Sequence, residues 1–514
     1  MKRSSKAGLL GTAGASMAAV TLLAGGGTAV AHDAFAAGAE PAANPRVGIQ
    51  DNVLVSGLRQ DPVAWGQLPL TNPDAALGTT HYGYNTSGGG PLTQNSKEAF
   101  KTEPDKNVYL VFGGHHYLYQ GHEGGPAGYV TRVDLDQTDP KQRVKLIAGT
   151  DGSGGKLPTF DGITWDPFSR QLLLTAESSA PTGGVFAVAL DANGDPTSSG
   201  AVRLTALGSG GYEGIQNDAD GNVWIVEDIG GAAAGTAGKG KVPNSYVYRF
   251  TPTDRTDLTK GGTLQALQVL RAGGTPVTAA QLQVDGRDPV IADLHTYGKT
   301  FTTAWATVTD VSNSTAGAKA AGATPFKRPE NGVFRPGTGF KEFYFTETGD
   351  TNALSDLPGA FGAVFRLTQS GPSAAKGTIS PVTVGDVTHT GLDNISFASK
   401  DQLLVVEDAG DGLHAQRGAL DSGYALDLRK KEDRTPFRWL AEGRDGSATY
   451  DALFSPGYND GDNEVTGIHT SDGDVTVGGI LGAKVPTQFA NGWRIFWTQQ
   501  HGENVTWELQ LKQK

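Results

Sequence analysis

Acidic residues at the start of five similar segments are the side chains of this sequence best placed to do chemistry. Each segment opens on a carboxylate, continues into a short apolar run, turns at a cluster of Gly, Asp, Asn or Lys, and returns along a second apolar run. In a hairpin the first and last residues lie side by side, so opening and closing acids meet at one end. The opening acids are Asp161, Glu213, Glu330, Asp393 and Glu464; the closing acids are Glu177, Glu227, Asp228, Glu347, Glu407 and Asp408.

Carboxylates gathered in this way predict a bound cation. Like charges at close range raise one another's pKa and repel, and a metal ion offsets that cost. Oxygen ligands suit hard cations, and Ca²⁺, which takes roughly six to eight of them, fits a ring of acids better than Mg²⁺ does. We therefore predict several Ca²⁺ ions bound by Asp161, Glu213, Glu330, Asp393 and Glu464.

A structural interpretation of the same acids is also open. Asp and Asn before a strand often form turns, and acids at strand ends are often solvated or hydrogen-bonded to backbone amides. A turn could be formed equally well by Ser, Thr or Asn and does not require Glu. The recurrence of Glu among the opening acids therefore favours metal binding over turn formation for the set as a whole. Of the closing acids other than Glu177, we expect about half to face solvent.

Two further residues are candidates for catalysis. Arg328 stands two positions before Glu330, so the alternation of an extended chain sends both side chains to the same side. Its guanidinium could fork onto a phosphate or carboxylate beside the metal, or form a salt bridge to a neighbouring acid. His501 follows a predicted strand at 494–498 and could act as an acid or a ligand, or only form hydrogen bonds in a turn. The pair His115 and His116 is a weaker candidate.

The elements that must position these side chains are short strands. Runs of four to seven Val, Ile, Leu, Tyr and Phe residues are separated by Gly, Asp, Asn and Pro, as is typical of strands. Only 276–284 and 415–427 suggest helices. The protein is therefore predicted to be all-β.

The spacing of the repeats predicts a propeller. Successive opening acids are 52, 117, 63 and 71 residues apart, and the long step suggests a degenerate sixth unit around 293–310. Six units of mostly strands suit a six-bladed β-propeller, whose innermost strands would bring the acids into one axial ring. Segments 107–135, 494–498 and 505–510 would supply outer strands that close the ring. A β-sandwich with repeated hairpins is the alternative.

The chain divides into three predicted parts. Residues 1–36 have a basic start, an apolar run and two Ala-x-Ala spacings, which predicts a cleaved signal peptide and export, with a membrane anchor as the alternative. Lys2-Arg3 resembles a twin-arginine pair only in part, so the export route stays open. Residues 37–100, rich in Gly and Pro, predict an N-terminal wrapping segment with few strands, and 101–514 the propeller; 312–323 suggests a surface insertion.

Composition excludes several classes of function. The 514 residues carry a formal charge of −12, which argues against nucleic acid or an anionic membrane as partner. The chain has no cysteine, so it has no disulfide, thiolate ligand, iron–sulfur cluster or cysteine nucleophile. Past the N-terminal run, no segment is apolar for long enough to span a bilayer. The sequence also lacks Gly-x-Ser-x-Gly, Walker and His-Glu-x-x-His motifs.

Four motifs in order give the chain a family resemblance. They are Arg328-Pro329-Glu330, Leu392-Asp393-Asn394-Ile395, Glu464-Val465-Thr466-Gly467 and Gln500-His501-Gly502. With them, roughly 149–508 resembles the PhoX-like alkaline phosphatases. The resemblance implies an exported, calcium-dependent six-bladed propeller that hydrolyses phosphate monoesters at a cluster of calcium and ferric ions. It implies metal ligation by Glu213, Glu330, Asp393 and Glu464, more loosely by Glu177, and phosphate contact by Arg328.

The sequence departs from the family at one ligand. The family's iron cluster uses a cysteine, whereas the corresponding stretch here is Thr159-Phe160-Asp161-Gly162. Asp161 could replace the thiolate by an oxygen ligand, which would shift the preference from Fe³⁺ toward Ca²⁺. We expect an exported metal-dependent phosphatase acting on a small phosphorylated substrate. The alternatives are a non-catalytic propeller stabilised by calcium and a calcium-dependent propeller lactonase.

Overall fold

The structure is a computed structural model. It describes residues 34–36, 38–46, 50–74, 78–84, 102–124, 127–198, 200–235, 238–282, 287–430, 435–443, 464–501 and 504–512. The chain divides into two units, Met1–His32 and Asp33–Lys514, and everything below concerns the second. The predicted signal peptide lies outside the described residues except at 34–36.

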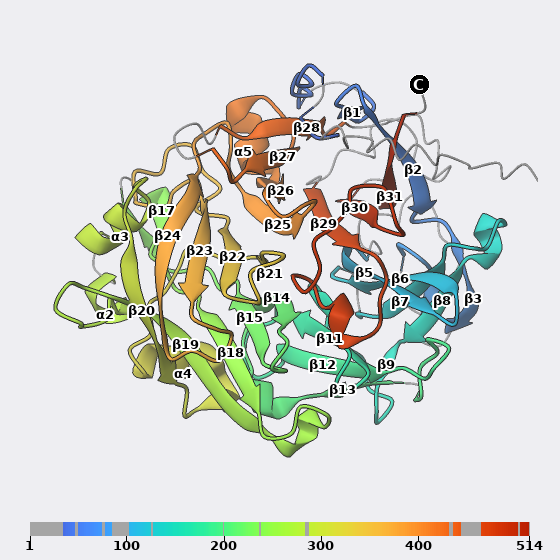
Figure 1. The fold of residues 1–514 in the computed structure, drawn as a ribbon, viewed down its shortest axis with the longest axis horizontal. Helices are drawn as coiled ribbons and strands as arrows, with labels where there is room; N and C mark the ends of the chain where they lie inside the picture. Colours follow the sequence, from blue (N-terminus) through green and yellow to red (C-terminus); the bar gives the residue numbers. More distant parts are fainter. Residues whose placement is uncertain are drawn as a thin grey trace, which may run out of the picture. The chain divides into compact units, whose positions relative to one another are not determined.

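The second unit is an all-β fold with a propeller-like ring of sheets and few helices (Figure 1). One sheet has the strand order β4-β3-β8-β7-β6-β5 and the next β10-β11-β12-β13-β9. Their bounds are β3 (Pro69–Asp74), β4 (Thr79–His81), β5 (Pro104–Phe112), β6 (His115–His122), β7 (Val130–Asp134), β8 (Val144–Ala148), β9 (Thr150–Asp151), β10 (Ile163–Asp166), β11 (Gln171–Ala176), β12 (Gly184–Ala189) and β13 (Gly200–Arg203).

A nine-stranded sheet follows, with the order β14-β15-β18-β19-β20-β24-β23-β22-β21. It holds two antiparallel repeats joined through β20. Its strands are β14 (Tyr212–Asn217), β15 (Val223–Glu227), β18 (Val247–Pro252), β19 (Gly262–Leu270), β20 (Phe301–Thr307), β21 (Gly332–Phe334), β22 (Glu342–Glu347), β23 (Ala363–Gln369) and β24 (Lys376–Val384). A separate hairpin pairs β16 (Ala233–Ala234) with β17 (Gly240–Lys241).

Two further sheets complete the ring, in the orders β1-β28-β27-β26-β25 and β2-β31-β30-β29. Their strands are β1 (Val53–Leu54), β2 (Leu58–Ala64), β25 (Leu392–Phe397), β26 (Gln402–Glu407), β27 (Ser422–Asp427), β28 (Phe437–Ala441), β29 (Glu464–Ser471), β30 (Arg494–Gln500) and β31 (Val505–Leu511). The described helices are α2 (Ala279–Leu282), α3 (Pro289–Leu294), α4 (Ser314–Ala320) and α5 (Gly410–Arg417), with 3₁₀ turns at Pro140–Gln142, Thr205–Leu207, Leu258–Lys260, Val311–Asn313 and Val477–Gly479. Among the described residues, no helix is both long enough and apolar enough to span a membrane.

The first strands of the repeats close into a cycle. β5, β10, β14, β21, β25 and β29 contact one another in that order, and β29 contacts β5. The core lies between successive sheets, because both faces of each sheet are covered. One cluster, for example, packs Val108 and Tyr119 against Trp165 and Leu174 of the next sheet. This two-sided burial explains why the apolar runs are nearly continuous.

Several local predictions are wrong. Segment 293–310 is not a repeat opened by an acid, since it contains the end of α3 and then β20. The predicted helix at 415–427 ends with α5 at Arg417 and gives way to strand β27. Segment 312–323 is not a surface insertion, because Ala318 and Ala323 are buried in the core beside Tyr212.

The N-terminal segment differs from the prediction of few strands. Within its described part, β1 pairs with β28, β2 with β31 and β3 with β8, so the segment extends three separate sheets. Of the segments predicted to supply outer strands, 107–135 does more than that, whereas 494–498 and 505–510 lie in β30 and β31, outside β29 in their sheet, as predicted. Segment 107–135 contains most of β5, which lies in the inner cycle, and β5 begins directly before Asp105.

Candidate metal centre

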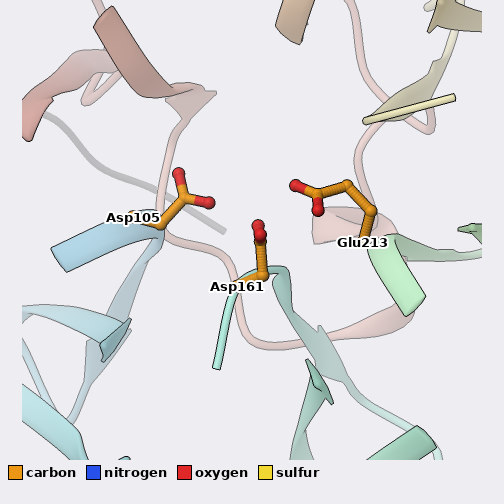
Figure 2. Close-up of side chains that lie close together, drawn as sticks. All are labelled: Asp105, Asp161 and Glu213. Carbon is orange, nitrogen blue, oxygen red and sulfur yellow. The ribbon is translucent and has the colours of Figure 1, made fainter. Parts of the chain in front are cut away.

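The opening acids converge where the first strands meet. Each of four overlapping groups offers ligand atoms that all lie within 4.8 Å of one another. In Figure 2 the carboxylates of Asp105, Asp161 and Glu213 point toward one another from neighbouring elements. The groups are Asp105–Asp161–Glu213, Asp105–Asp393–Glu464, Glu213–Glu330–Asp393 and Glu123–Asp161–Glu177. We call Asp105, Asp161, Glu213, Glu330, Asp393 and Glu464 the acid ring.

Local irregularities of the first strands aim these side chains. The antiparallel register shifts between Tyr212 and Ile215 around Glu213, and between Leu392 and Ile395 around Asp393. The same shift occurs around Asp105 in β5 and in β29 after Glu464. A bulge re-aims a side chain that regular alternation would direct elsewhere, and bulges recur beside functional sites.

Threonines of the second strands fix the backbone of the acids. Thr175 Oγ1 donates to the carbonyl of Glu213, the acid of the next repeat. Thr346 does the same to Asp393 at 2.5 Å, and Thr498 to Asp105 at 3.4 Å. In these three places one repeat holds the acid of its neighbour, so the positions of these acids depend on how successive repeats pack.

The acid ring is buried and rich in negative charge. Asp105, Asp161, Glu213, Glu330 and Asp393 are each at most 5% exposed. Burial, followed by neighbouring carboxylates, raises the pKa of Asp161, Glu213, Glu330, Asp393 and Glu464 above their ordinary values. Oδ1 of Asp161 is buried without a hydrogen-bond partner. An oxygen donor set with an unsatisfied buried oxygen fits a hard cation, so the residues present suit the metal predicted for them.

Glu177 joins the centre through the fourth acidic group, which shares Asp161 with the acid ring. Its carboxylate lies with those of Glu123 and Asp161, and burial together with Asp228 raises its pKa to about 8. All six predicted metal ligands thus lie in these acidic groups.

Arg328 lies among the ring acids, about a quarter exposed (24%). Its Nε and Nη2 donate to Oδ2 of Asp228 at 2.8 and 2.7 Å, and Nη2 lies 3.4 Å from Oε1 of Glu330. Arg328 has a left-handed backbone (φ 58°), so a turn rather than regular alternation brings it beside Glu330. The guanidinium is therefore placed both as a salt-bridge partner and beside the candidate ligands.

His501 lies beside the centre rather than in it. Its Nδ1 is 3.2 Å from Oε1 of Glu103, and it belongs to none of the acidic groups found among the described residues. The neighbouring Gln500 instead donates to Oε2 of Glu123 at 2.9 Å. His115 and His116 begin β6 beside an exposed turn, where both contact Asp136, and they belong to none of the acidic groups.

The other closing acids are mostly buried by structural partners, so the expectation that half face solvent is wrong. Glu227 accepts hydrogen bonds from Tyr248 and Thr315, and Asp228 pairs with Arg328. The remaining partners are His295 for Glu347 and Arg417 for Glu407, while Asp408 is partly exposed.

Sequence reasoning missed Asp105, Lys106, Glu123 and Gln500. The signal for two of them was present, because Asp105 opens a strand, a Gly-Gly turn follows, and the return strand leads to Glu123. That is the pattern of the other repeats, so the sixth opening acid is Asp105 and not a residue of 293–310. Lys106 left no such signal, and Gln500 stood in the fourth motif without a role of its own, since only the closed cycle brings the two residues to the centre.

Fold and site together define a propeller-like protein with a carboxylate-rich candidate metal centre. The sequence model of the family described as "Alkaline phosphatase PhoX" matches residues 195–478, more than half of the chain. The chain belongs to this family.

One solved structure agrees with that fold. The chain is similar to Pseudomonas fluorescens PhoX in complex with vanadate, with a TM-score of 0.56, 13% identity, and coverage of 92% of this chain and 98% of that one. A second solved structure, described as "a putative 6-phosphogluconolactonase" from Bacteroides fragilis, matches at 11% identity over 68% of this chain and 82% of that one. Its TM-score of 0.29 is too low to inform fold or function. No curated protein matches the chain.

Proposed function

We propose that the protein is an exported, metal-dependent phosphatase that hydrolyses phosphate monoesters at the acid ring. The observation that carries the proposal is the convergence of buried carboxylates from successive repeats, with Oδ1 of Asp161 unpartnered among them. Membership of the PhoX family supports the reaction class.

The acid ring, together with Glu123 and Glu177 beside it, would hold the metal. Their oxygen donors fit Ca²⁺, and several ions are expected from the number of overlapping groups. Fe³⁺ is the less favoured ion, because the chain lacks the cysteine that the family resemblance implies as an iron ligand. When bound, such ions polarise phosphoryl oxygens and lower the pKa of bound water.

The chain's own cations would bind the substrate. Arg328 is partly exposed and presents a planar fork beside Glu330, which suits the oxygens of a phosphoryl group. Asp228 holds that fork in orientation through two contacts on one oxygen. His501 remains a prediction as an acid for the leaving group, with Glu103 orienting its ring.

The same proposal covers chain organisation. We propose a signal peptide at 1–36, an N-terminal wrapping segment at 37–100 and a catalytic propeller of six blades at 101–514. The closed cycle of first strands supports six blades, with the nine-stranded sheet counted as two. Export is supported by the N-terminal sequence pattern.

The test is hydrolysis of p-nitrophenyl phosphate by the purified protein, with chelator and with added Ca²⁺, alongside elemental analysis. We expect turnover that chelation abolishes and Ca²⁺ restores. Asp161→Asn should lose activity and metal, whereas Asp136→Asn, on the exposed turn, should keep both. A folded, calcium-loaded sample without turnover would reject the phosphatase and leave the calcium-stabilised, non-catalytic propeller.

A further inference from the structure

A buried lysine lies at the axis of the ring of strands. Lys106, next to Asp105 in β5, is only 2% exposed. Its Nζ donates a hydrogen bond to Oδ1 of Asn331, the residue after Glu330. In the cycle of first strands β5 and β21 are three steps apart, so this bond crosses from one side of the cycle to the other. The ammonium group therefore lies between the opening acids.

The charge of Lys106 is shared by the ring rather than paired with one acid. Asp393, Asp105, Asp161 and Glu213 all interact with it through space and oppose the lowering of its pKa by burial. Among the described residues no ion pair ties its amine to a single carboxylate. The backbone N–H of Tyr109, three residues after Lys106 in β5, donates to Nε2 of His469 at 3.2 Å, and the pKa of His469 is lowered to about 3 by burial and then by Lys106. Lys106 thus lies in the field of the candidate ligands, whose carboxylates favour its protonated form.

We propose that Lys106 is a resident cation of the acid ring that limits the number and charge of the metal ions the ring takes up. The inference rests on the proposed metal site. A fixed positive charge repels an incoming ion in proportion to that ion's charge, so it opposes Fe³⁺ more than Ca²⁺. Lys106 would thereby favour calcium in a chain that also lacks a thiolate ligand.

Replacing the ammonium by an apolar group of similar length tests the proposal. Lys106→Met and wild type are loaded with CaCl₂ or ferric citrate and desalted, and metal per chain is counted by mass spectrometry. Calcium affinity is measured by calorimetry. We expect Lys106→Met to bind about one more Ca²⁺ per chain, or to bind Ca²⁺ about tenfold more tightly, with a larger gain for Fe³⁺.

Two variants serve as controls. Lys106→Arg keeps the charge and should keep the wild-type metal content. Lys327→Met removes the other lysine that is buried among the described residues, which is paired with Asp350, and should leave the metal count unchanged. Unchanged or reduced metal binding in folded Lys106→Met overturns the proposal. So does failure of Lys106→Met and Lys106→Gln to fold at saturating Ca²⁺ while Lys106→Arg folds, because an ion would then not replace the ammonium.

The count of metal per chain needs no turnover, which separates this inference from the phosphatase. If the wild type shows no phosphatase turnover but Lys106→Met still binds more metal than the wild type, the phosphatase proposal alone is rejected. Turnover with an unchanged metal count in Lys106→Met would reject the role of the lysine alone.

Discussion

At the scale of single residues, Arg328 combines three properties that a phosphate-binding group needs. It is partly exposed, its fork is oriented by Asp228, and it lies 3.4 Å from Glu330 of the acid ring. Only Nε and Nη2 of the guanidinium contact Asp228, and both contact the same carboxylate oxygen, so Nη1 takes no part in this pairing. The remaining donor, Nη1, can face a substrate.

We predict that Arg328→Ala lowers kcat/KM for p-nitrophenyl phosphate by about 100- to 1,000-fold, since one preorganised charge at the developing negative charge is lost. Arg328→Lys should recover part of it, because a lysine supplies charge without the fork. Arg335→Ala removes a different arginine, also paired with two acids, and should leave kcat/KM near wild type. Equal losses in Arg328→Ala and Arg335→Ala would mean that fold damage, not phosphate binding, explains the effect.

At the scale of elements, bulges in the first strands direct the acidic side chains of the repeated hairpins toward one common site. In β29 the irregularity contains Gly467, which has a left-handed backbone (φ 62°). A Cβ there would lie 2.8 Å from the carbonyl oxygen of Asp105 and 2.8 Å from Oγ1 of Thr498. The bulge therefore needs glycine both for its conformation and for its close approach to the first repeat.

We predict that Gly467→Ala lowers the free energy of unfolding by about 2–4 kcal/mol, from left-handed strain and overpacking together. Gly492 is the matched control, because it is also left-handed (φ 85°) but has nothing within 4 Å of a Cβ. Gly492→Ala should cost only about 1 kcal/mol. Denaturant unfolding measures both, and equal costs would show that the contact with Asp105 is unimportant.

At the scale of the whole molecule, the fold gathers buried acids whose ionisation opposes folding. Burial raises the pKa of Glu177 and Glu227 to about 8 and that of Glu407 to about 7. In the unfolded chain these groups ionise near pH 4.3, so between roughly pH 4 and pH 8 the folded state binds more protons than the unfolded state. The stability of the metal-free protein should therefore fall as the pH rises through this window.

We predict that the Tm of chelator-treated protein decreases from about pH 5 to pH 8, and that Ca²⁺ raises Tm more at the upper end, where the ligands bind it ionised. Differential scanning fluorimetry at both pH values, with chelator and with Ca²⁺, measures this. Glu227 lies outside the acidic groups, and Glu227→Gln keeps a hydrogen-bonding side chain at that position. This variant should make the decrease of Tm with pH smaller and leave the increase of Tm with Ca²⁺ in place. A Tm that rises with pH in chelator would contradict the prediction.

Much of this protein can be predicted from local patterns of residue type. Alternating and continuous apolar runs predict strands, and the recurrence of an acid before each run predicts the opening acids from Asp161 to Glu464, all of which the structure brings together. The family follows from motifs in the chain as well. These features depend on neighbours along the sequence, because side-chain alternation and hairpin pairing are local.

Tertiary structure alone decided which residues meet across the axis. Asp105 joins the acid ring because β29 contacts β5, and Lys106 reaches Asn331, 225 positions further along the chain. Arg328 lies beside Glu330 through a left-handed turn, and bulges aim several of the acids. None of these placements is encoded in a local period, because ring closure and a shifted register depend on contacts between distant segments. The sequence by itself thus determined the kind of ligand, and the closed ring determined the set of residues around it.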